Sequence, residues 1–259
     1  MKKTALITGA SKGIGKELAR VFASENCDVV LVARSQPELE QLEKELAEKY
    51  GVDVYVIVKD LTKENAANEV FNELKQNEID VDYLVNNAGF GDYGAFADTP
   101  WERYEKMIAL NMTALTHFCS LYTSDWKGRK KGKIMNISST AAFQPGPMMA
   151  VYFATKSYVL LLSEAIGKEL KNTDITVTTI CPGPTSTHFG QESGMNASKL
   201  VKNVKILDAA KVARQSYNAM MRGKPVIISG NMNKIAPFFI RFMPRTWVTA
   251  LSDRVMREK

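Results

Sequence analysis

The sequence predicts a doubly wound α/β fold, a Rossmann-like single domain around a seven-stranded parallel sheet. First, short β-branched apolar runs alternate with longer segments of helical periodicity. Second, these runs are nearly continuous in apolar residues, which is typical of strands buried on both faces. Third, 259 residues with 45% hydrophobic content can enclose one large core, and no repeat or Pro/Gly/Ser-rich linker divides the chain. Regular alternation of strand and helix favours right-handed crossovers and a parallel sheet.

The expected elements follow in order along the chain. Strand-length apolar runs occupy residues 4–8, 28–33, 53–58, 83–86, 133–138, 176–181 and 225–229. Helices are expected between them, where apolar residues recur every three or four positions. In residues 38–50, for example, one apolar face opposite charged residues is formed by Leu39, Leu42, Leu46 and Tyr50.

Composition limits the class of protein. The apolar run after Lys3 stops at Gly9, which is too short for a signal peptide, and no stretch of about 18 apolar residues could span a membrane. Three widely spaced cysteines lie in apolar runs and are expected to be reduced, so we expect a cytoplasmic protein. The net charge of +6 does not indicate nucleic acid, because six basic and two acidic residues from Gly230 onward supply four of these charges.

A glycine-rich loop follows the first expected strand and opens a helix. Glycines permit a tight turn and let the backbone approach a pyrophosphate, whose charge is stabilised by free amides and the helix N-terminus. The spacing departs from the G-x-G-x-x-G form, with three residues between the first two glycines and one between the last two. A turn without a ligand is the alternative. The expected cofactor-binding residues of this loop are Gly9, Ser11, Lys12, Gly13, Ile14 and Gly15.

The end of the second expected strand bears on the choice between NADP(H) and NAD(H). An NAD-selective fold places Asp or Glu there for the ribose 2′-hydroxyl, but this chain has Ala33 and Arg34. Arg34 can pair with a 2′-phosphate through its planar guanidinium, and Lys12 can add a second positive charge. The sequence therefore favours NADP(H), with NAD(H) as the alternative if both cations are simply solvated.

Tyr152 and Lys156 lie four residues apart in a segment expected to be helical, so they share one face. A phenol has an ordinary pKa of about 10, and a neighbouring ammonium is expected to lower that pKa toward the range of a working acid or base. Because such pairs also occur in ordinary helices, the spacing alone does not establish a catalytic role. Proton chemistry at Tyr152 is the function that the pair indicates.

Taken together, the motifs resemble those of the short-chain dehydrogenase/reductase family, over nearly the whole chain from Thr4 to about Ser229. The glycine loop is similar to the family's cofactor loop, and residues 86–89, Asn-Asn-Ala-Gly, to the motif after its fourth strand. Ser139, rather than its neighbour Ser138, stands 13 residues before Tyr152, as the family pattern requires. The residues that match the family's catalytic tetrad are Asn111, Ser139, Tyr152 and Lys156.

The resemblance implies an enzyme that interconverts a carbonyl and an alcohol with a nicotinamide cofactor. Tyr152 would exchange a proton with the substrate oxygen, and Ser139 would hydrogen-bond that oxygen. Lys156 would also bind the nicotinamide ribose, and Asn111 would support a proton path through water. A protein that senses NADP(H) without turnover is the alternative, and its expected mark is a broken tetrad.

The resemblance also implies further cofactor contacts and a homodimer or homotetramer. Asp60 follows the third expected strand and equally suits an N-cap of the next helix. The implied cofactor-binding residues outside the glycine loop are Arg34, Asp60, Leu61, Asn87, Ala88, Gly89, Tyr152, Lys156, Pro182, Gly183 and Thr187.

Apolar side chains are expected on the substrate side of the site, which favours an aromatic or aliphatic ketone over a sugar. The expected substrate contacts are Tyr93, Phe143, Met149 and Phe189. Residues 182–207 form a long irregular region that we interpret as a lid, the alternative being a surface excursion. No metal is expected, because His117 and His188 are the only histidines and no Cys, Asp or Glu stands at ligand spacing.

We divide the chain into residues 1–230, a dinucleotide-binding and catalytic domain, and residues 231–259, a C-terminal helical extension packed on the same domain. The extension combines aromatic with basic residues, among them Phe238, Phe242, Arg245 and Trp247. Three interpretations compete: a helix pair that caps the pocket or a subunit interface, a membrane-surface anchor, or a disordered end. Capping is favoured over membrane contact, because aromatics at this density are expected to be buried.

Overall fold

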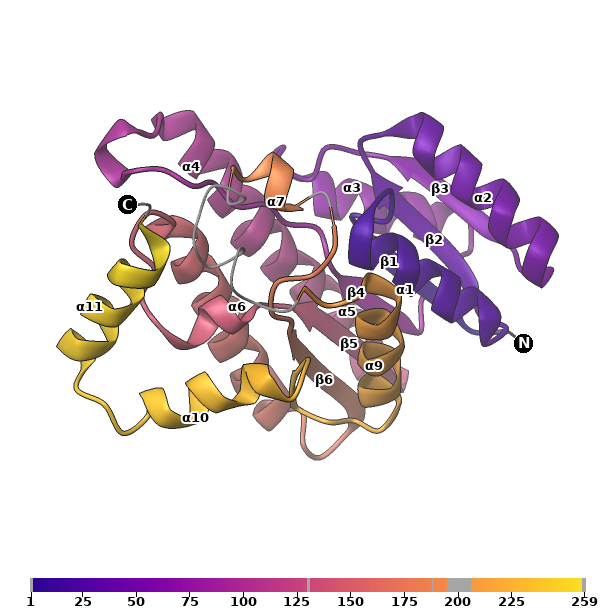
Figure 1. The fold of residues 1–259 in the computed structure, drawn as a ribbon. Coiled ribbons are helices and arrows are strands. Elements are labelled where there is room, and N and C mark those ends of the chain that lie inside the picture. The colour runs from indigo at the N-terminus through magenta and orange to yellow at the C-terminus, as the bar shows by residue number, and fades with distance from the viewer. Residues whose placement is uncertain (1, 130, 188, 195–205, 258–259) are drawn as a thin grey trace.

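The computed structural model describes residues 2–129, 131–187, 189–194 and 206–257. Seven parallel strands form one sheet in the order β3-β2-β1-β4-β5-β6-β7 (Figure 1). The strands are β1 Thr4–Thr8, β2 Asp28–Ala33, β3 Val54–Val58, β4 Tyr83–Asn86, β5 Lys131–Ile137, β6 Asp174–Cys181 and β7 Val226–Ile228. The predicted doubly wound α/β class is thereby confirmed. Strands β5 and β6 begin two residues earlier than the apolar pattern indicated, because backbone pairing continues from Lys131 opposite Asp174.

Helices cover both faces of the sheet. They are α1 Gly13–Ser24, α2 Gln36–Tyr50, α3 Ala66–Gln76, α4 Trp101–Ile108, α5 Leu115–Arg129, α6 Ala150–Glu169, α7 Phe189–Glu192, α9 Ala209–Met221, α10 Ile235–Ile240 and α11 Arg245–Met256. One apolar core contains the inner sides of α1, α2 and α9, and the other contains those of α3, α5 and α6. No helix in the described ranges is both long enough and apolar enough to cross a bilayer.

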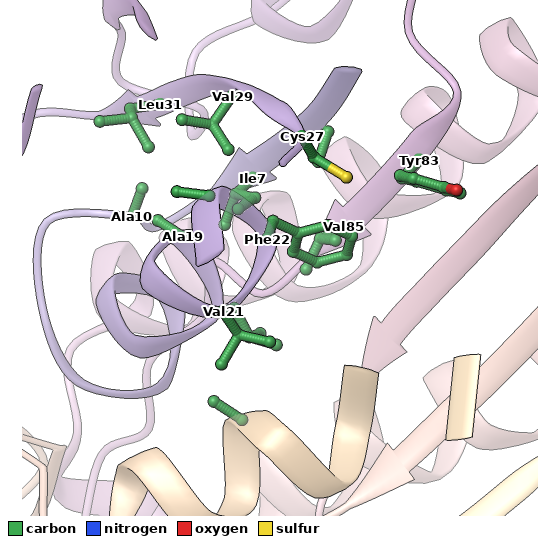
Figure 2. Packing of buried hydrophobic residues seen from close by; sticks show 14 of the residues in the cluster. Ile7, Ala10, Ala19, Val21, Phe22, Cys27, Val29, Leu31, Tyr83 and Val85 are labelled. Carbon is green, nitrogen blue, oxygen red and sulfur yellow. The ribbon is translucent and has the colours of Figure 1, made fainter. Parts of the chain in front are cut away.

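The core beneath α1 shows how the apolar pattern is satisfied. Phe22 of α1 lies against Tyr83 of β4, with ring centroids 5.6 Å apart (Figure 2). Ile7 and Leu31 from the two neighbouring strands are fully buried in the same cluster. Removing each such side chain from water contributes roughly 1.5–3 kcal/mol. This packing holds α1 against the sheet.

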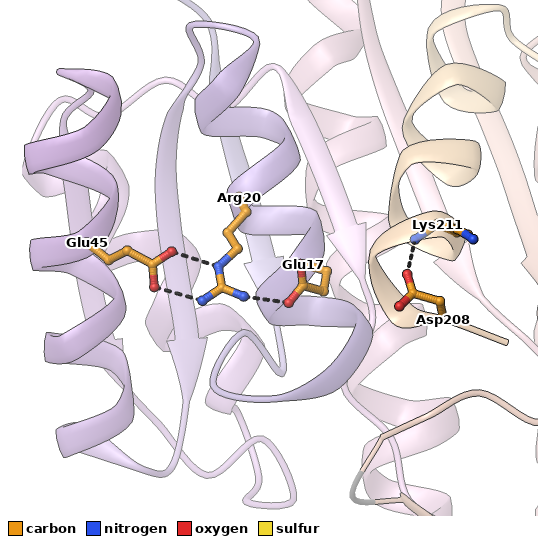
Figure 3. Close-up of polar contacts among 5 residues, drawn as sticks. All are labelled: Glu17, Arg20, Glu45, Asp208 and Lys211. Carbon is orange, nitrogen blue, oxygen red and sulfur yellow. Dashed lines mark hydrogen bonds and ion pairs between the residues drawn. The ribbon is translucent and has the colours of Figure 1, made fainter. Parts of the chain in front are cut away.

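Polar contacts fix the helices that flank the glycine loop. Arg20 of α1 donates to both carboxylate oxygens of Glu45 on α2, at 2.7 and 2.8 Å, and to Glu17 at 2.6 Å (Figure 3). The hydrogen bond from Arg20 lowers the pKa of the Glu45 carboxyl. On α9, Asp208 accepts from the backbone amide of Lys211 at 2.8 Å and so caps the helix N-terminus.

Sheet topology places the ligand site. The strand order reverses between β1 and β4, whose neighbours continue in opposite directions along the sheet. In open α/β sheets, ligands bind beyond the carboxyl ends of the strands at this switch point. The segments that follow β1, β4, β5 and β6 carry the motifs singled out from the sequence, so the fold brings those motifs to one edge.

The segment after β7 differs from its expected burial. It forms α10 and α11, drawn in yellow along one edge of the molecule, away from α2 (Figure 1). Met256 is 1% exposed and packs in the cluster that contains Tyr152, and Tyr93 donates to the Met256 carbonyl oxygen at 2.7 Å. Phe242 and Trp247, however, are 75% and 66% exposed. The helices therefore touch the domain while most of their aromatic surface faces outward, because each short helix has only one side against the body.

Candidate active site

A cleft of about 1670 Å³ lies at the carboxyl edge of the sheet. This exceeds the roughly 300–1,000 Å³ of a site for one drug-sized ligand, so it can hold a dinucleotide together with a substrate. Its walls come from the ends of β1, β2, β3, β4, β5 and β6. Among the expected site residues, the cleft is lined by Gly9, Ser11, Lys12, Gly13, Ile14, Arg34, Asp60, Leu61, Asn87, Ala88, Gly89, Ser139, Tyr152, Lys156, Pro182, Gly183, Thr187 and Phe189.

The glycine loop requires its glycines for two different reasons. Gly9 and Gly13 have φ of +67° and +55°, a left-handed conformation that L side chains rarely adopt. Gly15 is buried under the loop instead of lining the cleft, and a Cβ there would lie 2.2 Å from the Gly9 carbonyl oxygen. The loop is thus drawn tightly over the N-terminus of α1. Such a bare backbone turn at a helix N-terminus suits a pyrophosphate.

Hydrogen bonds join the glycine loop to the motif after β4. The Thr8 hydroxyl accepts from the amides of Asn87 and Ala88, both at 3.0 Å. The Asn87 side-chain amide donates to the carbonyl oxygens of Thr8 and Gly9, at 2.9 and 3.1 Å. Across the cleft, Thr187 lies beside Gly13. Three loops that are distant in sequence therefore meet around the cleft.

The end of β2 forms a positively charged corner. Lys12 and Arg34 are both exposed and both line the cleft. Within the described part of the chain, Arg34 has no carboxylate close enough for an ion pair, whereas nearby Lys59 pairs with Glu69 at 2.9 Å. Arg34 is thus available to an anion.

Asp60 shapes the adjoining wall without capping α3. Its carboxylate accepts from the Thr62 backbone amide and hydroxyl, at 3.0 and 2.8 Å. Burial alone would raise the pKa of Asp60, but these hydrogen bonds and the Arg34 charge lower it. The residue at the N-cap position of α3 is Asn65, five residues later, so the N-cap alternative for Asp60 is wrong.

Tyr152, Lys156 and Ser139 meet at the floor of the cleft. Tyr152 and Lys156 lie one turn apart on α6, and the Lys156 ammonium is 5.8 Å from the centroid of the Tyr152 ring. The ammonium also donates to the Ile137 carbonyl oxygen at 2.9 Å. Ser139 precedes a 3₁₀ turn after β5, where its hydroxyl accepts from the Ala141 backbone amide at 3.1 Å, and its proximity lowers the pKa of the Tyr152 phenol. Ser138 is buried and donates to the Lys156 carbonyl oxygen at 2.7 Å, so its hydroxyl is engaged elsewhere.

The proton affinities of this trio differ from the expectation. Burial raises the pKa of Tyr152 to about 12, and the hydrogen bond with Ser139 opposes this only in part. Burial also lowers the pKa of Lys156 to about 8. The pKa of the phenol is therefore raised and not lowered as expected, because burial penalises the charged phenolate more than its neighbours stabilise it. Tyr152 is therefore a neutral proton donor near pH 7.

Asn111 lies behind the cleft wall and does not line it. It sits in a π-helical stretch, Ala109–Ala114, between α4 and α5, a departure from α-helical geometry that is frequent at functional sites. Its side-chain amide donates to the Phe90 carbonyl oxygen at 2.9 Å and to the Thr155 hydroxyl at 3.0 Å. Its oxygen accepts from the Phe90 amide at 3.1 Å. Asn111 thus ties the loop after β4 to α6 directly beneath Tyr152.

Of the four expected substrate contacts, only Phe189 lines the cleft. Its ring centroid is 5.2 Å from that of Tyr152. Met149 is 2% exposed and packs under Tyr152, because it precedes the first turn of α6 and turns inward. Phe143 packs against Leu160 and Cys181, and the Tyr93 hydroxyl is engaged by Met256, so these side chains support the walls.

The structure adds cleft residues that the sequence did not indicate. Arg103 of α4 lines the cleft, where it pairs with Asp92 at 2.9 Å and lies over the Phe90 ring at 5.3 Å. Ala236 and Pro237 of α10 form part of the rim. No local motif marks these positions, since only the tertiary fold brings them to the site. His188 and residues 195–205 of the expected lid lie outside the described residues.

The described residues contain no cluster of three or more His, Cys, Asp or Glu side chains that could hold a metal. The fold and the cleft instead match the arrangement in which open α/β sheets bind a dinucleotide. The family model for short chain dehydrogenases matches residues 3–197. The chain belongs to the short-chain dehydrogenase family, which confirms the resemblance.

Individual relatives support this assignment. The Mycobacterium tuberculosis protein named "Probable oxidoreductase EphD" is 33% identical over 193 residues, which cover 74% of this chain and 32% of EphD. The chain thus spans about a third of the length of that curated relative. A short-chain dehydrogenase from Sphingobium yanoikuyae, solved in complex with NADPH, is 29% identical with a TM-score of 0.82, covering 94% of this chain and 97% of that one. The bulky-bulky ketone specific alcohol dehydrogenase from Comamonas testosteroni is 30% identical with a TM-score of 0.78, covering 93% and 92%.

Proposed function

We propose that the chain reduces the carbonyl group of bulky apolar ketones to an alcohol with NADPH. The observation that carries this proposal is a neutral, buried Tyr152 phenol that lines, with Ser139 and Lys156, a cleft large enough for a dinucleotide. A phenol with a pKa of about 12 keeps its proton near pH 7 and is suited to give it to a carbonyl oxygen.

The residues of the cleft fit a nicotinamide dinucleotide. The turn over Gly9 and Gly13 leaves room for a pyrophosphate at the N-terminus of α1. Arg34 and Lys12 supply two cations where the 2′-phosphate of NADP(H) would lie. The NADPH complex of the Sphingobium relative supports NADPH as the preferred form, and NAD(H) remains the alternative. When bound, the nicotinamide supplies a hydride to the carbonyl carbon.

Each member of the trio then has a separate task in the proposed mechanism. Ser139 donates a hydrogen bond to the substrate oxygen and orients it toward Tyr152. Tyr152 transfers its phenolic proton to that oxygen, and the ammonium of Lys156 stabilises the phenolate that remains. Asn111 fixes the loop at Phe90 and the first turns of α6, so that these groups keep their relative positions.

The substrate side favours bulky apolar molecules. Phe189, Phe90 and Phe153 line the cleft together with Tyr152, and the lining extends to Ala236 and Pro237 of α10. The ketone specificity in the name of the Comamonas relative supports the same substrate class. Arg103 adds one cation at the cleft, already neutralised by Asp92. The proposed substrates are therefore uncharged cyclic or diaryl ketones.

Reduction of a ketone panel tests this proposal directly. We expect NADPH-dependent turnover of cyclic and diaryl ketones at a kcat/KM at least about tenfold above that of acetone or an aldose. The reason is that only the bulky ketones bury a large apolar surface when they bind in the cleft. We also expect NADPH to exceed NADH by at least about tenfold, since charge-assisted hydrogen bonds contribute roughly 1.5–3 kcal/mol. Loss of NADPH absorbance measures both quantities. A preference for NADH, or equal turnover of sugars, contradicts the proposal.

The pH profile of reduction is a second prediction. Lys156 carries its charge below its pKa of about 8 and loses it above. Because the ammonium stabilises the phenolate formed at Tyr152, kcat/KM is expected to be highest below about pH 8 and to fall as pH rises through that value. A Lys156→Arg variant keeps its charge throughout, so its residual activity should lack the fall. Identical profiles for both proteins would exclude Lys156 as the titrating group.

The oligomeric state stays a prediction. We propose a homodimer or homotetramer in which α4 and α6 meet a second copy. Trp101 and Leu161, which lie on these helices, are 63% and 65% exposed and would be covered by such pairing. Light scattering of the purified chain measures the state, and a monomer would contradict this expectation.

A further inference from the structure

The outer side of α10 and α11 exposes a concentration of large apolar side chains. We call this the tail surface and define it by Ile235, Phe238, Phe239, Phe242, Trp247, Leu251 and Val255. The Phe238 ring lies 5.4 Å from Phe239 and 5.6 Å from Phe242, and all three remain more than half exposed. Their contacts are with one another, which leaves an aromatic cluster open to solvent.

Helix α11 has one row of residues buried against the domain and a second, apolar row exposed to solvent. Val248, Ser252 and Met256 recur every four residues and are buried against the body. The exposed members Trp247, Leu251 and Val255 recur with the same spacing, one position earlier along the helix. The inner row anchors the helix, so the outer row is not needed to hold it in place. An apolar row that the fold does not use indicates a contact with something else.

Exposed basic residues alternate along the chain with these apolar residues. Lys234, Arg241, Arg245, Arg254 and Arg257 are exposed in the same segment. The only acidic residue among the described residues after Gly230 is Asp253, which already pairs with Arg257 at 2.7 Å. In those described residues, Arg241, Arg245 and Arg254 have no carboxylate partner. The tail surface therefore combines exposed aromatic rings with an excess of unneutralised guanidinium groups.

We propose that the tail surface docks on the surface of an anionic membrane. Aromatic side chains enter the boundary between headgroups and acyl chains, while arginines pair with lipid phosphates. A second copy of this chain fits less well, because a twofold interface pairs the patch with itself and would set two surfaces of net positive charge face to face. The two helices have 6 and 12 residues, so they would lie on the bilayer without crossing it.

Docking would also orient the cleft. Ala236 and Pro237 of α10 form part of its rim, two and one residues before Phe238 of the tail surface. Apolar ketones dissolved in the bilayer would therefore reach the cleft from the membrane side. This consequence rests on the proposed function, whereas docking itself does not, and the two are measured separately.

Vesicle sedimentation with the full chain tests the proposal without any activity assay. We expect the chain to pellet with vesicles of phosphatidylcholine and phosphatidylglycerol, to remain in solution with phosphatidylcholine alone, and to be released by high salt. The triple variant Arg241→Gln, Arg245→Gln, Arg254→Gln should bind the anionic vesicles at least about tenfold more weakly, since each basic residue near the surface contributes about 1 kcal/mol. Trp247→Ser should weaken binding in the same assay.

Matched controls separate docking from general effects of charge or apolar surface. Lys44, Lys127 and Lys171 are exposed on other elements, and changing all three to Gln removes the same charge. Phe96→Ser removes a ring that is 64% exposed, against 66% for Trp247. Both controls should pellet like the unchanged chain. The proposal would be overturned if the arginine variant bound vesicles as tightly as its lysine control, or if the chain did not pellet at all. It would also be overturned if the variants changed only the oligomeric state, because the tail surface would then contact a second copy of the chain.

Discussion

Replacing Tyr152 by Phe is expected to lower kcat for ketone reduction by about 10³-fold, while NADPH still binds. Proton transfer by a positioned side chain typically contributes 10²–10⁴-fold. The ring itself would stay in place, because Phe153, Phe189 and Met149 pack around it and none of these contacts needs the hydroxyl. Stopped-flow reduction and NADPH fluorescence titration measure turnover and binding separately.

Tyr158→Phe provides the matched control for this result. Tyr158 lies on the same helix, and its hydroxyl is 2.9 Å from that of Thr116, outside the cleft lining. Removing that hydroxyl should leave kcat within about twofold, because the hydroxyl does not contact the reacting atoms. The lost hydrogen bond should lower the stability of the fold by only about 1 kcal/mol. Retained turnover in Tyr152→Phe would mean that another group supplies the proton and would refute the proposed mechanism.

The fold was predictable because its signals are local and repeated. Buried parallel strands need nearly continuous apolar runs, so β1 and β2 could be bounded to the residue. The position of the glycine loop was equally predictable, because a left-handed turn such as that at Gly9 favours glycine over other residues. Where pairing rather than burial sets the end of a strand, as at Lys131 and Asp174, the pattern was two residues short.

Placement at the cleft was predictable for residues that directly follow a strand. Ser139 and Asn87 continue from buried strands, so the parallel topology brings them to the cleft. Tyr93 and Met149 lie in longer connections whose side chains can turn either way, and both turn into the protein. Arg103 reaches the cleft from another helix, for which the sequence holds no periodic signal.

Burial changed the chemical argument as well. From sequence, Lys156 was expected to lower the pKa of Tyr152, but enclosure of both groups moves each toward its neutral form. Spacing along a helix reports which side chains are neighbours and not how much water surrounds them. The aromatic residues of the tail surface illustrate the converse, because their density indicated burial whereas only one side of each short helix is covered.

Gly15→Ala is expected to weaken NADPH binding by roughly 5- to 150-fold, because overpacking of this kind costs roughly 1–3 kcal/mol and each 1.4 kcal/mol corresponds to a factor of ten. The added methyl group would lie 2.2 Å from the Gly9 carbonyl oxygen and 2.4 Å from the Asn87 side-chain amide nitrogen. To accommodate it, the loop must lift, and the bonds from Asn87 to Thr8 and Gly9 must lengthen.

Gly128→Ala is the control, since a Cβ at that helical position on α5 meets nothing within 4 Å. Alanine is favoured over glycine in helices by about 1 kcal/mol, so this variant should bind NADPH normally and unfold at an equal or higher temperature. Calorimetric titration with NADPH measures the affinity of both variants. If Gly15→Ala bound NADPH as tightly as Gly128→Ala, the close approach of the glycine loop to Asn87 would not be needed for the cofactor. The main contacts that hold the cofactor would then have to be assigned to the opposite wall of the cleft, at Pro182, Gly183 and Thr187.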